Sequence, residues 1–349
     1  CKGCKRDCPT GVDMARLKVE VTAQRRAVHG DRALDRVLGA LPSRAPLLSA
    51  LAPLVNAALK LPGARALADR ALGLAPQRSL PRWRRDTFWR QGAGVPTVGA
   101  AAAMAAAPRS AVLFVDTFNG HFETENAQAA ARVLHAGGYA VHVAAGRERP
   151  LCCGRTHLAA GQVDAARERL RELLDTLEPL ARAGVAIVGL EPSCLLTLRD
   201  EALVLGLGDA AQVVSKQALL FEEFIAREAT AGRLQLKLKA ATQPLLLHGH
   251  CHQKAFGAMP AVVQALKLIP GAVVDTVDSS CCGMAGAFGY EAENHVVSMQ
   301  MAEAALLPAV RAAPGATVVA SGTSCRHQIA DGAARQAQHV AVVLAAYLP

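Results

Sequence analysis

The chain has 349 residues, of which 52% are hydrophobic, 4% aromatic and 19% charged. This composition is too apolar for a disordered chain, and at about 150 residues per domain the length predicts two domains or slightly more. The net charge is +9, but residues 1–90 carry +11 and residues 91–349 carry −2, which excludes a protein that is basic throughout, such as a histone-like binder. No apolar run reaches about 18 residues without a charge or proline, so we expect no transmembrane helix.

The ten cysteines are the second unusual feature of the composition. The chain begins at Cys1, without an initiator Met or a secretion signal, so we expect a fragment or processed product from a reducing, cytoplasmic compartment. Clustered thiols in such a compartment more often hold metal or do redox chemistry than form disulfides. The positions are Cys1, Cys4, Cys8, Cys152, Cys153, Cys194, Cys251, Cys281, Cys282 and Cys325.

Residues 1–36 open with Cys1, Cys4 and Cys8 in the pattern C-x2-C-x3-C-P. These match the last three cysteines of the bacterial ferredoxin run, and closely spaced thiolates of this kind predict part of a 4Fe–4S site. In such runs the final cysteine, here Cys8, ligates the other cluster of a pair. A zinc site is the alternative, because C-x2-C also begins zinc motifs. A helix is expected to follow, with Asp13 in its first turn.

Residues 37–108 are expected to form a helical, basic connecting segment. The part at 37–75 predicts short amphipathic helices interrupted by prolines, and 92–108, rich in Gly, Ala and Pro, predicts a linker. The run Arg82-Trp83-Arg84-Arg85 has two interpretations, which are a solvated surface and contact with anionic lipid or a partner protein. No nucleic-acid-binding motif accompanies it. The interrupting prolines are Pro42, Pro46, Pro53 and Pro62.

From residue 109 onward, short apolar runs alternate with helical stretches, which is typical of parallel α/β sheets. The predicted strands are 111–115, 139–143 and 185–189, and the predicted helices are 124–136 and 161–183. The same order recurs later, with strands at 244–247, 272–274 and 316–320 and helices at 260–268 and 291–312.

The cysteines repeat together with this alternation. Cys152-Cys153-Gly154 matches Cys281-Cys282-Gly283 at an offset of 129 residues, and the Ser-Cys pair that ends at Cys194 matches the pair that ends at Cys325 at an offset of 131. Two landmarks at nearly one offset indicate an internal duplication. We therefore predict an α/β protein whose two similar lobes, 109–240 and 241–349, have parallel sheets.

The cysteines of the second lobe, Cys251, Cys281, Cys282 and Cys325, each follow a predicted strand. Loops after parallel strands converge at one sheet edge, so we expect these thiols to meet. Adjacent cysteines rarely form a disulfide with each other, but they can present two thiolates to a multi-iron cluster. The spacing of the glycines at 283, 286 and 289 predicts backbone N–H groups close to the sulfurs.

Three histidines, His248, His250 and His252, surround Cys251. In an extended strand the histidines share one face and Cys251 points to the other. We expect them to pack and form hydrogen bonds around the site rather than ligate metal, with a zinc site as the alternative.

The first lobe has the equivalent set Cys152, Cys153 and Cys194, but the position that corresponds to Cys251 falls near residues 116–118, which include no cysteine. Three thiolates hold a cluster only with another ligand, so a structural or vestigial role is an open alternative to cofactor binding.

These motifs resemble the cysteine-rich CCG domains of heterodisulfide reductases, the glycolate oxidase iron–sulfur subunit and lactate-utilisation proteins. The stretch 1–18 resembles the end of the ferredoxin module that precedes such domains. The chain as a whole resembles the C-terminal part of fused FAD-linked oxidases with iron–sulfur motifs, of the D-2-hydroxyglutarate and D-lactate dehydrogenase type. The stretches that carry this resemblance are 248–254, 281–290 and 321–326.

The resemblance implies an iron–sulfur oxidoreductase in which 1–36 is a ferredoxin-like remnant, followed by two CCG lobes. Its function would be electron transfer in a flavin-dependent 2-hydroxy acid dehydrogenase of the glycolate, D-lactate or D-2-hydroxyglutarate class. FAD would lie in a preceding part or a partner subunit, and the acceptor would be a quinone or another carrier. No catalytic residue is expected in this chain, which would be inactive alone, and a peripheral contact at the inner face of the membrane is a further expectation.

The family pattern ends in C-x-x-C, whereas Thr197 and Gln328 stand at the final positions of this chain. The resemblance therefore implies one ordinary four-thiolate site, formed by the second-lobe cysteines, and not a five-thiolate cluster. Two other functions stay open. One is a thiol–disulfide redox subunit like heterodisulfide reductase, and the other is a zinc-stabilised scaffold that docks partners without catalysis.

Overall fold

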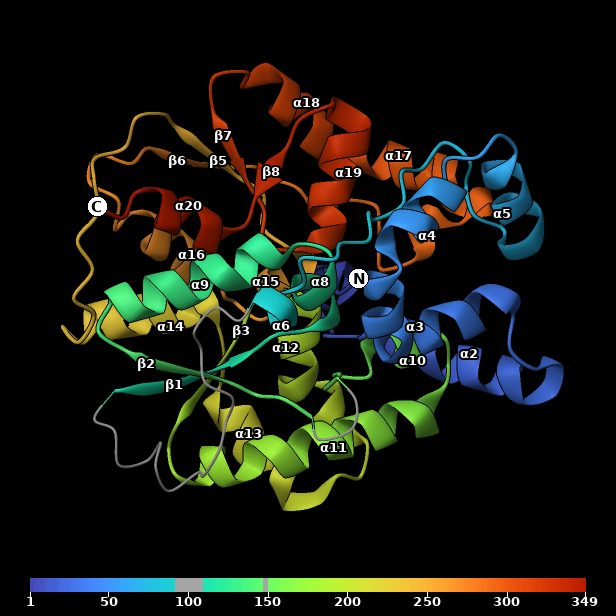
Figure 1. Cartoon of the computed structure of the whole chain (residues 1–349), viewed down its shortest axis with the longest axis horizontal. Helices are drawn as coiled ribbons and strands as arrows, with labels where there is room; N and C mark the ends of the chain where they lie inside the picture. The colour runs from blue at the N-terminus through green and yellow to red at the C-terminus, as the bar shows by residue number, and fades with distance from the viewer. Residues whose placement is uncertain (92–108, 147–149) are drawn as a thin grey trace.

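The computed structural model describes residues 1–91, 109–146 and 150–349, so the predicted linker at 92–108 lies outside the described residues. The N-terminal region is helical and lies along one side of the two lobes, coloured blue in Figure 1. Asp13 caps α2, where its side chain accepts hydrogen bonds from the backbone N–H groups of Ala15 and Arg16. The helices are α1 (Gly3–Asp7), α2 (Met14–His29), α3 (Ala33–Ala50), α4 (Ala52–Ala58), α5 (Ala64–Leu72) and α6 (Phe88–Gln91).

The prediction that prolines interrupt this region is wrong for Pro42 and Pro46, which lie inside the 18-residue helix α3. Each proline removes one backbone hydrogen bond, but α3 packs against α8 (Thr117–His121) and α10 (Arg155–Ala159) of the first lobe, and this packing outweighs the local cost. Pro53 instead occupies the first turn of α4, where a missing N–H costs little.

Two four-stranded sheets form the lobes, and all their strand pairs are parallel. The strand orders are β2-β1-β3-β4 and β6-β5-β7-β8, so the second sheet repeats the topology of the first. The predicted α/β fold and the predicted duplication are thereby confirmed. The strands are β1 (Ser110–Phe114), β2 (Ala140–Val143), β3 (Ala186–Gly189), β4 (Ala218–Leu220), β5 (Leu245–Leu247), β6 (Val274–Thr276), β7 (Thr317–Val319) and β8 (Ala337–Gln338).

Helices cover the first sheet and place its apolar side chains in the core. The longest, α11, buries a stripe of leucines at helical spacing, namely Leu170, Leu173, Leu174, Leu177 and Leu180. The elements of this lobe are α8 (Thr117–His121), α9 (Thr124–Ala136), α10 (Arg155–Ala159), α11 (Val163–Arg182), α12 (Pro192–Arg199), η1 (Glu201–Val204), α13 (Gly208–Gln217) and α14 (Phe221–Thr230).

In the second lobe, the single helical stretch predicted at 291–312 is broken into three elements. Ala305 has φ −155°, outside the helical region, and this break directs Leu306 and Leu307 into the core. The elements are α15 (Cys251–Ala255), α16 (Met259–Leu266), η2 (Phe288–Tyr290), η3 (Ala292–Asn294), α17 (His295–Glu303), α18 (Leu306–Ala312), α19 (Thr323–Ala333) and α20 (Val340–Ala346).

The two lobes share one hydrophobic core, in which Val188 and Phe221 of the first lobe pack with Leu247 and Val340 of the second. Helix pairs α9/α20 and α14/α16 pack across this junction. The N-terminus lies near the middle of the molecule, where α1 packs against α15 (Figure 1). Among the described residues, no helix alone has the length and apolarity to cross a membrane, and the pair α3/α4 satisfies those criteria only jointly, across a 104° bend.

Candidate metal centre

The second-lobe cysteines lie where the sequence predicted, at the ends of successive parallel strands. Cys251 is the first residue of α15 after β5, the Cys281-Cys282 pair follows β6, and Cys325 lies in the first turn of α19 after β7. All four are buried free cysteines. Their thiols form a continuous series of contacts in which Cys251 meets Cys281, Cys281 meets Cys282, and Cys282 meets Cys325.

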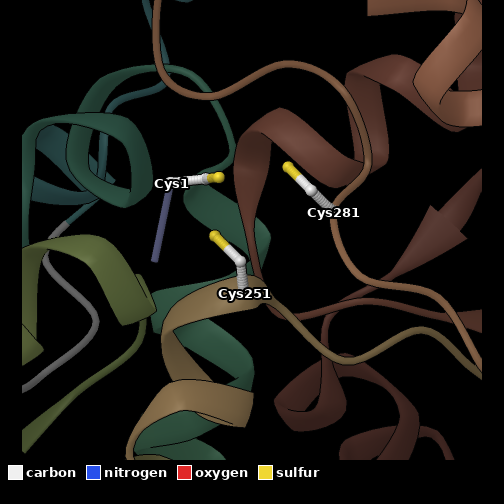
Figure 2. A group of neighbouring side chains, drawn as sticks. All are labelled: Cys1, Cys251 and Cys281. Carbon is white, nitrogen blue, oxygen red and sulfur yellow. The ribbon is translucent and has the colours of Figure 1, made fainter. Parts of the chain in front are cut away.

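Two groups of ligand atoms in this series are compact enough for metal coordination. The thiols of Cys1, Cys251 and Cys281 point toward one another, and their sulfurs lie within 4.8 Å of one another (Figure 2). A ring nitrogen of His248 lies within the same distance of the sulfurs of Cys282 and Cys325. The centre therefore brings together thiols from three loops of the second lobe and one thiol from the N-terminal segment.

The histidines do not share one face of a strand, because β5 ends at Leu247 and α15 begins at Cys251. His250 instead caps α15, where its ring accepts a hydrogen bond from the backbone N–H of His252. His248 bonds through Nδ1 to the Ser279 hydroxyl at 3.1 Å. The Nε2 atoms of His248 and His252 are buried and have no hydrogen-bond partner among the described residues. Unpartnered buried nitrogens beside thiols fit a metal centre, because metal ligation satisfies them.

The glycine of each C-C-G motif is required by the backbone. Gly283 has φ +90°, and a Cβ at this position would come within 2.2 Å of the Ser298 carbonyl oxygen. Its N–H donates a hydrogen bond to the Cys281 sulfur at 3.4 Å. This contact confirms the prediction that a backbone N–H group lies close to the sulfurs. The first lobe repeats the arrangement, since the Gly154 N–H donates to the Cys152 sulfur at 3.4 Å.

The electrostatics single out Cys251 among the second-lobe thiols. A hydrogen bond with Cys281 and burial both act to raise its pKa, but the charge and hydrogen bond of His250, with a hydrogen bond from His252, leave the pKa below its ordinary value. The pKa of Cys282 lies well above its ordinary value, because its hydrogen bond to Cys281 is outweighed by Cys325 and by burial. Four thiolates this close therefore need an added positive charge, which a metal centre supplies.

The N-terminal cysteines separate in the structure. Cys1 joins the second-lobe centre, whereas Cys4 is exposed and Cys8 is half-buried. In the part of the chain that the structure describes, neither Cys4 nor Cys8 belongs to a compact group of three ligand atoms. The hydrogen bond with the Thr10 hydroxyl, 3.1 Å from the Cys8 sulfur, lowers the pKa of that thiol, which favours the thiolate.

A buried ion network that the sequence did not reveal fixes this segment. The ammonium of Lys2 is fully buried and lies 2.7 Å from Asp13, 2.7 Å from Asp200 and 2.9 Å from Glu201. Arg155 reaches the same Glu201 carboxylate at 2.6 Å. A buried ammonium is stabilised only when it is paired in this way. Two of its acidic partners, Asp200 and Glu201, lie about 200 residues away along the chain, so no local sequence signal identified them.

The first-lobe cysteines, Cys152, Cys153 and Cys194, are also buried, free and in contact with one another. The hydrogen bond to Cys153 and burial raise the pKa of Cys152 well above its ordinary value. Although Cys153 donates to it, burial and the nearby Asp116 raise the pKa of Cys194 to about 12. Among the described residues these thiols form no compact group of three ligand atoms.

Asp116 occupies in the first lobe the position that His250 occupies in the second. It caps α8 as His250 caps α15, so Thr117 occupies the position of Cys251. Both carboxylate oxygens of Asp116 already accept hydrogen bonds, Oδ1 from the Phe118 and Asn119 N–H groups and Oδ2 from the Asn119 side chain at 2.6 Å. This carboxylate therefore serves the helix rather than a metal.

Comparison with known proteins agrees with the duplication. Residues 116–199 and 245–330 each match the cysteine-rich CCG domain. Over 305 residues the chain is 28% identical to the C subunit of the anaerobic glycerol-3-phosphate dehydrogenase of Escherichia coli (strain K12), with 84% of this chain and 72% of that protein covered.

The chain is also similar to two D-2-hydroxyglutarate dehydrogenases. It is 24% identical over 338 residues to that of Escherichia coli (strain K12), with 94% of this chain and 32% of the relative covered. It is 26% identical over 356 residues to that of Pseudomonas putida, with 99% of this chain and 33% of the relative covered. The chain thus spans about a third of the length of these two relatives.

Proposed function

The chain belongs to the CCG cysteine-rich domain family, and from this premise we propose that it is the iron–sulfur electron-transfer part of a flavin-linked dehydrogenase. The observation that carries the proposal is the buried series of thiols from Cys251 to Cys325, which ends in unpartnered histidine nitrogens. Neighbouring thiols that need added positive charge are a donor set suited to iron–sulfur chemistry. Apart from the cysteines, the sequence has no pattern typical of a nucleophile with an adjacent base, so we propose electron transfer and not substrate chemistry for this chain.

We assign the ligands of this centre to Cys251, Cys281, Cys282 and Cys325, with Cys1 and His248 as neighbours that complete its surroundings. A 4Fe–4S cluster bound here would accept and release single electrons. The chain's own part is to tune the potential, because burial, the Gly283 N–H bond to sulfur and the nearby Lys254 ammonium determine the stability of added negative charge.

We assign Cys4 and Cys8 to a ferredoxin-type site that passes electrons to the second-lobe centre, whereas Cys1, which the sequence pattern places with them, lies at the second-lobe centre in the structure. Support comes from the spacing of these cysteines and from the packing of α1 on α15, which brings the two sets side by side. We assign Cys152, Cys153 and Cys194 a structural role, because among the described residues they form no compact group of three ligand atoms and Thr117 stands where the second lobe has Cys251.

The domain boundaries 1–36, 37–108, 109–240 and 241–349 are part of the same proposal. FAD and the substrate would bind in another part of the dehydrogenase or in a partner subunit, and a quinone or another carrier would take the electrons. A 2-hydroxy acid is the substrate class we propose, since the relatives that match 94–99% of this chain are D-2-hydroxyglutarate dehydrogenases. An enzyme that oxidises glycerol 3-phosphate is the second candidate, because one relative that the chain covers by 72% is a subunit of such a dehydrogenase.

Peripheral membrane contact through the N-terminal helices completes the proposal. Of the 18 exposed large hydrophobic side chains among the described residues, 13 lie between Val12 and Leu80. The same region of the sequence carries the positive charge of the chain, and exposed apolar groups combined with cationic groups are typical of segments that lie on anionic membranes. Flotation with anionic vesicles tests this location. A protein that stays unbound at low ionic strength contradicts it.

The proposed function is tested by anaerobic purification or reconstitution, followed by iron and acid-labile sulfide analysis and electron paramagnetic resonance (EPR) of the reduced protein. We expect iron and sulfide in equal amounts and a signal from a reduced cluster. Zinc without sulfide would establish the docking scaffold instead. Reduction of the bound centre by a flavin dehydrogenase with its hydroxy acid then tests the electron-transfer role, and disulfide reduction without that transfer would favour the thiol–disulfide alternative.

A further inference from the structure

We propose that Glu222 takes up one proton when the second-lobe centre receives one electron, so that electron transfer through this centre is coupled to proton transfer. This inference rests on the proposed function, because it requires a redox centre at the second-lobe cysteines. The proposal concerns Glu222, which belongs to the first lobe, lies outside both C-C-G motifs and contacts two loops of the second lobe.

Glu222 is an unusual carboxylate in its surroundings. It lies in the first turn of α14 with no exposed surface. Its Oε1 accepts hydrogen bonds from the Ser321 hydroxyl and, at 3.3 Å, from the Gln253 side chain. Its Oε2 is buried and has no hydrogen-bond partner among the described residues. A buried carboxylate oxygen without a partner costs free energy when it is charged, and a proton removes that cost.

Both partners of Glu222 belong to loops that hold cysteines of the centre. Gln253 lies in the first turn of α15, two residues after Cys251, and its Oε1 accepts from the His250 backbone N–H at 2.9 Å. Ser321 directly precedes the turn that leads into α19 and Cys325. Glu222 is therefore joined by a direct hydrogen bond to each of two loops that position the sulfurs of Cys251 and Cys325.

No cation neutralises Glu222 in the part of the chain that the structure describes. The elements packed against α14 are α16, α20, β3 and β4, and none has an ionisable residue within its bounds. The neighbouring carboxylate of Glu223 pairs with Arg199 at 2.6 Å. His339, which caps α20, already bonds through Nε2 to the Leu190 carbonyl. On the side of α15 the charged or titratable groups are His250, Cys251, His252 and Lys254. On the side of Ser321 the Arg326 guanidinium donates to the Ser321 carbonyl oxygen and pairs with Glu123.

The energetics favour a proton at this position. Burial, with a smaller contribution from the charge of Glu223, raises the pKa of Glu222 to about 7, against the opposing hydrogen bond from Ser321. An electron added to a nearby buried centre repels the carboxylate further, because Coulomb interactions are strong at low dielectric. The electron comes from the reduced flavin of the dehydrogenase and the proton from solvent, which forms an O–H bond at Oε2. Both leave when the electron passes to the acceptor.

The test is a potentiometric titration of the cluster-loaded full chain, followed by EPR, at a series of pH values. Above pH 7 we expect the midpoint potential of the second-lobe centre to fall with pH. The coupling of one proton to one electron corresponds to about 59 mV for each tenfold change in proton concentration. Below this range the potential should level off, because Glu222 is then already protonated.

Glu222→Gln should make the potential independent of pH over this range, whereas Glu222→Asp, which keeps a titratable group, should retain the dependence. The matched control is Glu223→Gln on the same helix, which should retain the pH dependence, with its range moved to lower pH because the charge of Glu223 contributes to the raised pKa of Glu222. An unchanged slope in Glu222→Gln overturns the inference, and so does a flat parent titration. Iron and sulfide are measured first in each sample, so the absence of a cluster counts against the proposed function and not against the proton coupling.

Discussion

The two lobes share one fold and differ in the chemistry of their cysteines. Each has four parallel strands in the same order, a C-C-G turn after its second strand and a cysteine in the first turns of the helix after its third. Each C-C-G turn donates a backbone N–H to a sulfur at the same distance, 3.4 Å. The difference lies in one turn, where the first lobe has Asp116-Thr117 and the second has His250-Cys251.

The residues of that turn shift the pKa values of nearby cysteines in opposite directions in the two lobes. In the second lobe, the interactions of the His250 and His252 rings with Cys251 lower the pKa of that thiol. In the first lobe, the carboxylate of Asp116 contributes to a raised pKa for Cys194. The two lobes therefore keep the same C-C-G turn and differ in the electrostatic surroundings of their cysteines, beginning at the helix cap.

The largest expected effect comes from the position at which the lobes differ. Cys251→Ser removes the thiolate with the lowered pKa, so we expect the second-lobe centre to lose its iron and sulfide. Thr117→Ser, at the matched position of the first lobe, should leave both contents unchanged. Metal and sulfide analysis of the two variants checks this, and equal losses would contradict the distinction between the lobes.

The next effect concerns the polar contact that joins the lobes. Glu123 of the first lobe pairs with Arg326 of the second at 2.6 Å and also accepts from the Thr323 hydroxyl at 2.7 Å. Glu123→Gln leaves a buried guanidinium without its partner, so we expect a loss of about 3–5 kcal/mol in the free energy of unfolding. The exposed pair of Glu125 with Arg84 is the control, and Glu125→Gln should cost about 0–1 kcal/mol. Denaturant unfolding measures both.

The same pair predicts a pH dependence. Although burial acts to raise it, the charge and hydrogen bond of Arg326 lower the pKa of Glu123 from 4.5 to about 2. A lowered pKa in the folded state means that the stabilisation is complete above pH 4.5 and is lost as the pH falls toward 2. Glu123→Gln should flatten this part of the stability profile, and an unchanged acid limb would contradict the assignment.

The two C-C-G glycines sharpen the comparison at a smaller scale. Gly283 and Gly154 both have positive φ, so an alanine at either position should destabilise the protein by about 1–3 kcal/mol. Gly283→Ala should cost more, since its Cβ would lie 2.2 Å from a carbonyl oxygen, against 2.8 Å at Gly154. Only Gly283→Ala should also reduce cluster content. Unfolding and iron analysis distinguish the two, and cluster loss in Gly154→Ala would contradict the account.

The smallest effect is a shift in a single titration. In the metal-free protein, His250→Gln removes the charge that favours the Cys251 thiolate, so the pKa of Cys251 should rise. Thiolate absorbance against pH, in a background that lacks the other reactive thiols, measures this. His121→Gln, in the corresponding helix of the first lobe, is the control and should not move the titration.

Repeated features of the sequence predicted the fold well. The two cysteine offsets and the alternating apolar runs implied the duplicated parallel sheets, because local pattern and strand order agree in this architecture. Local rules failed where tertiary packing decided the outcome. Pro42 and Pro46 sit inside α3 because the helix packs on the first lobe. The strand β8 has only two residues, and β4 lies directly between α13 and α14 with no turn residues to separate it from them, so neither gave a pattern.

The candidate site was also predicted only in part, because its local features could be read from the sequence and its long-range contacts could not. Strand ends placed Cys251, Cys281, Cys282 and Cys325 together, but nothing local placed Cys1 beside them. That contact depends on the buried Lys2 and its partners Asp200 and Glu201, which are remote in sequence. The arrangement of the histidines was predicted wrongly, because that prediction assumed that the strand continues through His252. In the structure β5 ends at Leu247, before the first of the three histidines.

The central claim is that one lobe holds the redox centre and the other does not. It is tested most directly by the EPR spectra of two reduced double variants, Cys281→Ser/Cys282→Ser and Cys152→Ser/Cys153→Ser, each reconstituted with iron and sulfide. We predict that the first-lobe variant keeps the full spectrum and that the second-lobe variant loses one cluster signal. Loss of the signal from the first-lobe variant, or its retention in the second-lobe variant, would contradict the account.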